Sequence, residues 1–541
     1  MNSLFSCWPH PIGFWHLTFI KNPLPGPLCM VLILVTSFKT AAGDHMIINL
    51  IQKSLKNLSG TVLVTFSRST KDKKVNIAHG ELNSRLQEAV KSQLITGKLG
   101  ETQVYREIQF SGFRHVVLVG LGSDADMTHE SLRVAAAAVC EAVKALQAEE
   151  AFIDFDSILA KKNSSIFLKA FVEGLMLTSY DFSELKAKKK EPKKEVTFQI
   201  AMTEAKNTAV KNAFQEALIL SECVNFSRRL GDMPGNLMTP EILANEASEA
   251  AKGTGIKTTI WDLARIKKEN MGGLYGVSMG SDKEPRFIIM EYKGAAKTEK
   301  PIVYVGKGLT FDTGGISIKP SGGMEEMKYD MCGGANVIGT ILAIAKLKLK
   351  VNAIALIAST ENMPGPAAMK PGDVLFARNG KSFEVNNTDA EGRLILSDAL
   401  CYASELKPKW IVDTATLTGA MLVALGNIHT GYFTRNQKFK KNIEAAAEAS
   451  GELVWNLPLV DHHLKDMKGT YADLSNISSG KGAGSATAAA FLEQFVEEGI
   501  PWAHFDIAGT AWHVGGRLPY CPKKGASGAI LRTFVELAKQ K

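Results

Sequence analysis

Short apolar runs alternate with longer amphipathic stretches along most of the chain. Residues 132–148 carry apolar positions at helical spacing, whereas β-branched and aliphatic residues gather in short runs on either side of them. The strands predicted from these runs cover residues 61–66, 107–110, 115–120, 151–155 and 196–201. Strands that alternate with helices predict a parallel sheet with crossover helices.

The same alternation continues after a long predicted helix over residues 208–230, in which Phe214, Leu218 and Val224 fall at roughly helical spacing. Further helices are predicted over residues 240–252 and 333–346, and strands over residues 256–260, 286–292, 302–305, 353–358, 382–385, 410–414 and 502–507. We therefore predict an α/β fold of two domains. A smaller N-terminal α/β domain covers residues 46–205, and a linking helix covers residues 206–230. The larger C-terminal α/β domain covers residues 231–541 and has a mixed, largely parallel central sheet flanked by helices.

The first 45 residues differ from this pattern. They are rich in proline and end in an apolar run at residues 28–35, which is too short to span a bilayer as a helix. The small residues 41–43 fit a cleavage site, so residues 1–45 are consistent with a signal peptide and an exported protein. Lys21 is the only Lys or Arg before the apolar run, which weakens that interpretation. The alternative is a segment outside the folded protein, with the first domain starting near Met46 and the protein staying in the cytoplasm.

Composition narrows the class of protein. The chain has 541 residues, of which 45% are hydrophobic and 22% are charged, an ordinary balance for a soluble chain of two or three domains. The net charge of +8 permits attraction to nucleic acid but does not require it. Seven cysteines without a CxxC spacing argue against a disulfide framework and favour a reducing compartment.

Four acidic residues stand out because they lie in or between two glycine-containing blocks that each follow a strand-like run. They are Asp312, Asp330, Asp389 and Glu391. Charged side chains in such places are expected at the open end of a sheet, where α/β enzymes hold their sites. Four converging carboxylates cannot all stay ionised without a counter-charge. A pair of divalent cations about 3.5–4 Å apart would supply that charge and share one activated water.

These residues lie in motifs that resemble those of a known family. The motifs are VGKGLTFDTGG at 305–315, MKYDM at 327–331, NTDAEGRL at 387–394, DTATLTGA at 413–420 and DIAGTAW at 506–512. Together they resemble the leucyl aminopeptidases of the bacterial cytosol aminopeptidase type. The resemblance covers roughly residues 220–541, and over 46–205 it is one of pattern only.

The resemblance implies a metal-dependent aminopeptidase that removes leucine and other apolar residues from the N-terminus of peptides. It implies two divalent cations per subunit, Mn²⁺ or Zn²⁺. In that assignment Asp312 and Glu391 bridge the cations, Asp389 completes one site, and Lys307 and Asp330 complete the other. A lysine ligand must be neutral, and two adjacent cations would lower its pKa.

Two further cations receive catalytic roles from the resemblance. Lys319 polarises the substrate carbonyl and stabilises the oxyanion, and Arg393 holds a bicarbonate that accepts the water's proton. The positions that match the pocket for the first side chain are Met327, Thr416, Gly419, Ala508 and Ala511. Asn387 and Leu417 match contacts to the amino end and the peptide. The family also forms hexamers, so we expect a homohexamer.

Other functions stay open at this point. A DNA-binding or architectural hexamer would use the lysine-rich run at residues 186–194, although no aromatic residues interleave it. A nucleotide-dependent enzyme would use the glycines of residues 120–125, which fit a dinucleotide fingerprint loosely. The adjacent His462 and His463 are a further metal candidate, but on a polar stretch such a pair is usually solvated.

Overall fold

The computed structural model describes residues 34–39, 45–52, 58–70, 72, 74–123, 127–158, 164–187 and 195–540. The chain forms two compact units. The first contains the described residues up to Ser221 together with Leu518–Cys521, and the second contains Glu222–Arg517 and the residues from Pro522 onward. The boundary falls inside helix α5, Thr208–Asp232. This helix confirms the one predicted over residues 208–230.

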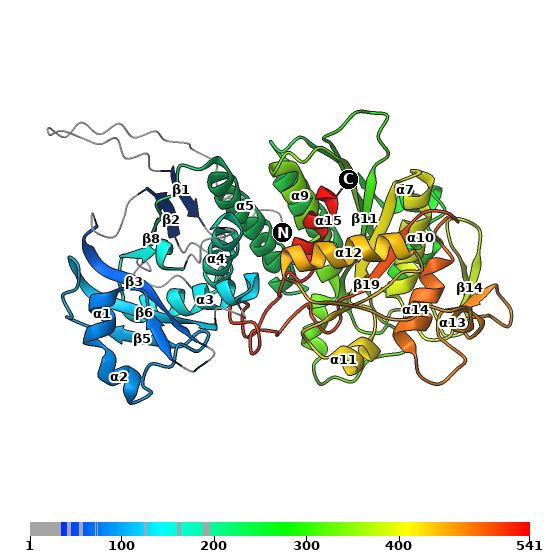
Figure 1. Cartoon of the computed structure of the whole chain (residues 1–541). Coiled ribbons are helices and arrows are strands. Elements are labelled where there is room, and N and C mark those ends of the chain that lie inside the picture. The colour runs from blue at the N-terminus through cyan, green and yellow to red at the C-terminus, as the bar shows by residue number, and fades with distance from the viewer. Residues whose placement is uncertain are drawn as a thin grey trace. The chain divides into compact units, whose positions relative to one another are not determined.

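The first unit is built on an eight-stranded sheet (Figure 1). Its strands are β1 Leu34–Lys39, β2 His45–Ile51, β3 Gly60–Ser69, β4 Val75–Ile77, β5 Thr102–Tyr105, β6 Phe113–Ser123, β7 Glu150–Asp154 and β8 Val196–Ala201. The neighbours β2, β8, β7, β3 and β6 run parallel, and β1, β4 and β5 join antiparallel. The predicted parallel sheet is confirmed for the central strands.

Alternation along the strands explains how both faces of this sheet are covered. Val62 and Val64 of β3 lie in one core with helices α3, His129–Ala145, and α4, Ser164–Thr178. Leu63 points to the opposite core, which includes Leu82 of α1, Gly80–Arg85. The remaining helical segments of this unit are α2 Gln87–Lys91 and the 3₁₀ turn η3 Phe155–Ser157.

Two sequence predictions in this unit are wrong in detail. Residues 107–110 form no strand, because Glu107 and Gln109 have positive φ values of 56° and 48° in the turn that precedes β6. The glycines of the loose dinucleotide fingerprint at residues 120–125 do not follow the strand, because β6 continues through them to Ser123, and residues 124–126 lie outside the described residues.

Some predictions fall on segments that the structure describes only in part. Within the segment predicted to precede the first domain, Leu34–Lys39 forms β1 and pairs with β2. Residues 1–33 and 40–44, with the candidate cleavage site, lie outside the described residues, as do residues 188–194 of the lysine-rich run. Within the described part of the chain, none of the helices combines the length and hydropathy needed to cross a bilayer.

The second unit contains a mixed sheet in the order β17-β16-β19-β15-β11-β12-β10-β9. Its strands are β9 Ile256–Trp261, β10 Arg286–Lys293, β11 Ile302–Asp312, β12 Asn352–Asn362, β15 Trp410–Ala415, β16 Thr430–Phe433, β17 Val454–Asn456 and β19 Trp502–Asp506. The central strands β19, β15, β11 and β12 are parallel, whereas β10 and β16 join them antiparallel. The predicted mixed, largely parallel sheet is confirmed. A small sheet of β13 Asp373–Phe376, β14 Ser382–Val385 and β18 Leu474–Ser475 stands beside it.

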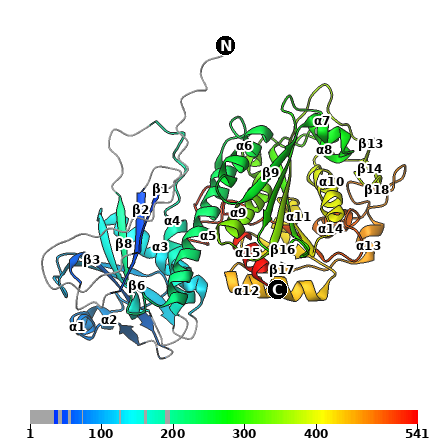
Figure 2. The ribbon, with the colours of Figure 1, turned by 90° about the horizontal axis from the view of Figure 1, so that it is seen from above.

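Helices cover both faces of this sheet. Figure 2 shows α6 Pro240–Ala251, α9 Cys332–Lys346 and α15 Leu531–Lys539 on one side of the sheet, and α8 Gly272–Ser278, α10 Gly392–Glu405 and α14 Gly484–Glu493 on the other. The others are α7 Leu263–Lys268, η4 Met324–Met331, α11 Gly419–Leu425, α12 Gln437–Ser450 and α13 Asp461–Lys465. Because β11 is buried on both faces, burial is nearly continuous along it instead of alternating, and its first four residues are all apolar.

Candidate active site

The site is organised by the carboxyl ends of four parallel strands. Asp312 ends β11 and Asn362 ends β12, while Thr416 directly follows β15 and Asp506 ends β19. These ends meet at one edge of the sheet, which is where open α/β sheets bind ligands. β11 extends seven residues past the predicted end at residue 305, so Lys307 lies inside the strand rather than after it.

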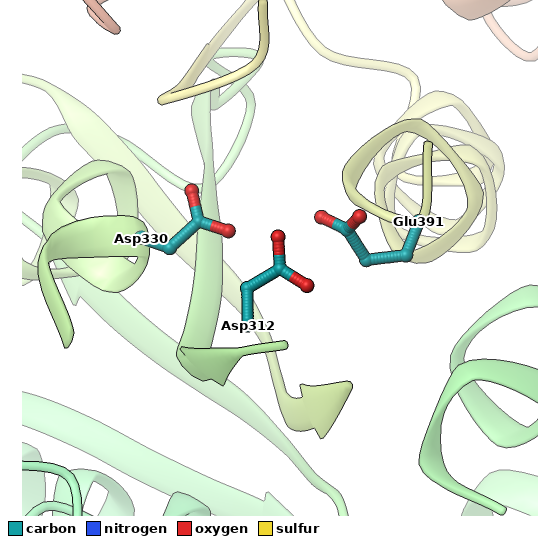
Figure 3. A group of neighbouring side chains, drawn as sticks. All are labelled: Asp312, Asp330 and Glu391. Carbon is teal, nitrogen blue, oxygen red and sulfur yellow. The ribbon is translucent and has the colours of Figure 1, made fainter. Parts of the chain in front are cut away.

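Three buried carboxylates converge at this edge from three different elements (Figure 3). Asp312 comes from β11, Asp330 from η4, and Glu391 from the position that precedes the first turn of α10. One oxygen of each lies within 4.8 Å of the others. Among the described residues this is the one group of three His, Cys, Asp or Glu side chains with ligand atoms so close together.

Lys307 lies between two of these acids. Its Nζ is 2.8 Å from Asp330 Oδ2 and 2.9 Å from Glu391 Oε1, and it donates a hydrogen bond to the carbonyl of Thr416 at 3.0 Å. Gly392 makes room for this side chain, because a Cβ there would lie 2.7 Å from Lys307 Nζ. The glycine of the NTDAEGRL motif is therefore a packing requirement of the cluster.

The fourth predicted acid, Asp389, is connected to the cluster through Lys319. Lys319 Nζ lies 2.8 Å from Asp312 Oδ2 and 2.5 Å from Asp389 Oδ1. The Asp389 side chain is 31% exposed, whereas that of Asp312 is 2% exposed. Asn387 Oδ1 accepts a hydrogen bond from the Asp389 backbone N–H at 2.8 Å, which closes a tight turn before α10.

In this cluster four carboxylates share the ammonium groups of only two lysines, so negative charge is in excess when all the acids are ionised. Burial, followed by the charges of Glu391 and Asp330, raises the pKa of Asp312 to about 7. Burial also raises the pKa of Asp389 to about 6 and that of Asp330 above its ordinary value. Burial opposes ionisation of Glu391 as well, but the ammonium groups of Lys307 and Lys319 outweigh it and lower its pKa.

The same cluster fits divalent cations. Glu391 Oε2 is buried and has no hydrogen-bond partner among the described residues, which is unusual for a carboxylate oxygen. Carboxylate oxygens are ligands for Mn²⁺ and Zn²⁺. A bound cation would satisfy this oxygen and reverse the pKa increases that burial imposes on Asp312 and Asp330.

Arg393 lies one residue into α10 and is buried beside the carboxylates. Its Nη1 donates to the carbonyl of Asn476 at 2.7 Å, and burial lowers the pKa of its guanidinium to about 10. Its Nε–H has no partner among the described residues. A buried, unpaired guanidinium donor is suited to bind an anion.

Apart from Asn387, which lies in the turn before α10, the residues predicted for substrate contact fall on three segments. Met327 lies on η4, Thr416 and Leu417 follow β15, with Gly419 opening α11, and Ala508 and Ala511 follow β19. Thr416 Oγ1 donates to Asp330 Oδ1 at 2.6 Å, which connects this segment to the cluster. The space beside Gly419 is open, because no atom lies within 4 Å of the position that a Cβ would take there.

Three polar residues that the sequence analysis did not single out organise the site. Asp506 Oδ1 accepts the backbone N–H groups of Leu417 and Ala508 at 3.2 and 3.1 Å. Asn362 Nδ2 donates to Asp312 Oδ1 at 2.8 Å. Both residues are the last of a buried strand, which is a detectable signal. Asn476 lies in a loop without a pattern, and its Nδ2 donates to the Asn387 carbonyl at 2.6 Å.

Comparison with known proteins shows the family. Residues 225–535 match the catalytic domain of the cytosol aminopeptidase family, and residues 62–189 match its N-terminal domain. A probable cytosol aminopeptidase of Bdellovibrio bacteriovorus is 66% identical over 499 residues, 92% of this chain and 100% of that protein. One from Burkholderia pseudomallei is 41% identical over 443 residues, 81% of this chain and 86% of that protein.

Solved structures agree with the sequence relatives. A mutant tomato leucine aminopeptidase superposes with a TM-score of 0.81 at 32% identity, covering 91% of this chain and 96% of that one. The bottromycin maturation enzyme BotP in complex with Mn gives a TM-score of 0.79 at 29% identity, covering 89% and 99%.

The comparisons confirm the resemblance carried by the five motifs, and they give no support to an architectural or DNA-binding protein. His462 and His463 lie on the short helix α13, where His463 Nδ1 accepts the Val460 N–H at 3.3 Å, as expected of a solvated pair. The chain belongs to the cytosol aminopeptidase family and is a metal-dependent aminopeptidase that acts on peptides.

Proposed function

We propose that the second unit removes leucine and other apolar residues from the N-terminus of peptides with two divalent cations, Mn²⁺ or Zn²⁺. The observation that carries this proposal is the convergence of Asp312, Asp330 and Glu391, with one oxygen of Glu391 left without a partner. Asp389 and Lys307 complete the proposed set of ligands. Asp312 and Glu391 are the proposed bridging ligands.

The cations, when bound, would polarise the scissile carbonyl and lower the pKa of a water molecule. The chain's own residues orient the other participants. The Lys319 ammonium, on the loop after β11, is proposed to donate a hydrogen bond to the carbonyl oxygen of the substrate as negative charge develops there. The Lys319 side chain is accessible to a substrate, because it is 21% exposed, against 3% for Lys307.

Arg393 is proposed to hold a bicarbonate ion that accepts the proton of the attacking water. The unpaired Nε–H supports this role, because a buried donor without a partner favours an anion. The hydrogen bond from Nη1 to the Asn476 carbonyl fixes the plane of the guanidinium. Bicarbonate bound at this position would act as a general base next to the carboxylate cluster.

Small and apolar side chains support the proposed preference for leucine. The proposed pocket for the first side chain is lined by Met327, Thr416, Gly419, Ala508 and Ala511. Such a lining accepts an aliphatic side chain and rejects a charged one. Asn387 and Leu417 are proposed to contact the amino end and the peptide of the substrate.

We further propose a cytoplasmic homohexamer. The relatives are named cytosol aminopeptidases, and the buried cysteines at positions 140, 223, 332 and 401 are free thiols. Light scattering on the purified chain tests the hexamer. N-terminal sequencing of the protein from cells tests the location, because cleavage at the small residues 41–43 would indicate export instead.

Metal removal and restoration test the proposed activity. The full chain is dialysed against a chelator and assayed with leucine p-nitroanilide before and after Mn²⁺ or Zn²⁺ is added. We expect activity to disappear and return, with two metal ions per chain by elemental analysis. Full activity with less than one ion per chain would refute the two-metal site. As a control, Lys350→Ala changes an exposed lysine outside the site and should lose and regain activity in the same way as the parent.

A further inference from the structure

Glu326 connects two segments that carry residues of the proposed substrate pocket. It lies on η4, four residues before Asp330 and directly before Met327. Its Oε2 accepts the indole N–H of Trp512 at 3.0 Å, and its Oε1 lies 3.2 Å from Nδ1 of His513. Both carboxylate oxygens are therefore used by consecutive residues of the segment that follows β19.

Ring contacts reinforce this connection. Tyr329 of η4 stacks on Trp512, with ring centroids 5.6 Å apart and planes 11° from parallel, and meets the His513 ring edge-on. The Lys328 ammonium lies 4.9 Å from the centre of the Tyr329 ring and donates to the Asp232 carbonyl at 2.8 Å. Stacked rings and a shared carboxylate restrict sliding between the two segments more than either would alone.

The backbone at His513 shows that this arrangement is imposed by its surroundings. His513 has a φ of 55°, a left-handed conformation that costs a non-glycine residue roughly 1–2 kcal/mol. Its N–H donates to the Gly525 carbonyl at 3.0 Å, and Trp512 forms an isolated bridge with Ala526. Conformations of this kind persist where several contacts determine them together.

We propose that Glu326 is a positioning residue that sets the width of the pocket and thereby the preference among apolar N-terminal residues. This inference rests on the proposed function. Met327 directly follows Glu326 and Ala511 directly precedes Trp512, so the Glu326–Trp512 hydrogen bond fixes the spacing between these two pocket residues. An apolar pocket distinguishes one methylene by about tenfold or more in kcat/KM, so a small change in its width alters selectivity.

The test compares Glu326→Ala with Glu325→Ala. Glu325 is the exposed neighbour on the same 3₁₀ helix and is the matched control. We measure kcat and KM for alanine, leucine and phenylalanine p-nitroanilides with the metal-loaded full chain. For Glu326→Ala we expect the leucine-to-alanine ratio of kcat/KM to fall about tenfold, mainly through KM for leucine, with metal content unchanged. Glu325→Ala should keep the parental ratio.

Two further variants separate positioning from general stability. Glu326→Gln retains an oxygen that accepts the Trp512 N–H, so we expect its ratio to stay within about threefold of the parent. Trp512→Phe keeps an aromatic ring for Tyr329 and removes the N–H donor along with part of the indole, and it should shift the ratio in the same direction as Glu326→Ala. If Glu326→Ala does not fold, Trp512→Phe tests the same hydrogen bond.

An unchanged leucine-to-alanine ratio in Glu326→Ala or in Trp512→Phe would overturn the inference. An equal loss for all three substrates, or a loss of metal, would overturn it as well, because Glu326 would then only stabilise η4. The proposed function is judged separately, by the parent chain. If the metal-loaded parent does not cleave the leucine substrate, the proposed function fails before any variant is compared.

Discussion

Replacing Lys319 separates metal binding from catalysis. In this structure the Lys319 ammonium lies 2.8 Å from Asp312 Oδ2 and 2.5 Å from Asp389 Oδ1, two oxygens that belong to proposed metal ligands. The ammonium and a cation therefore compete for the same oxygens. Lys319→Ala removes the competitor and leaves the carboxylates in place.

The size of both effects follows from these contacts. A hydrogen bond to a charged group contributes about 1.5–3 kcal/mol, and partial exposure of Lys319 places the value at the lower end. About 1.4 kcal/mol corresponds to a factor of ten, so the variant should bind metal about tenfold more tightly. Loss of one preorganised donor to the developing oxyanion should lower kcat by about 10²–10³, with KM near normal.

The assay combines competition for metal against a chromophoric chelator with steady-state kinetics on leucine p-nitroanilide. Lys350→Ala, an exposed lysine away from the cluster, should leave both quantities unchanged. An empty metal site in Lys319→Ala, or a kcat within about threefold of the parent, would refute the reasoning. Lys319 would then serve only to balance the charge of the carboxylates.

Three further substitutions test the packing around the site and in the first unit. Gly392→Ala places a Cβ 2.7 Å from Lys307 Nζ, so we expect metal content and kcat/KM to fall at least about tenfold, and normal metal content would contradict this. Asn362→Leu removes the hydrogen bond to Asp312 Oδ1 and should lower the free energy of unfolding by about 1–3 kcal/mol in calorimetry of the metal-free chain. Gly174→Ala sets a methyl group 2.7 Å from atoms of the facing helix α3 and should destabilise the first unit by about 1–3 kcal/mol, whereas an unchanged melting temperature would show that α3 and α4 separate easily.

The sequence by itself determined the fold class and most of the elements that carry the site. Strands β11, β12, β15 and β19 and helix α9 begin where the apolar runs predict them. The reason is local, because strands and helices buried against one sheet must be apolar over a length that a short window detects. The motifs also indicated which acids and lysines lie close together, since charged residues among glycines just after a buried strand are expected at the open end of a sheet.

The tertiary structure decided how those residues meet. Asp312 and Glu391 are 79 positions apart, and the strand order of the sheet brings their carboxylates together. Periodicity could not show that Lys319 pairs with Asp312 and Asp389, or that Glu326 joins η4 to the segment after β19. Each of these contacts depends on several distant elements packing at once, whereas a hydrophobic pattern records only which face of each element is buried.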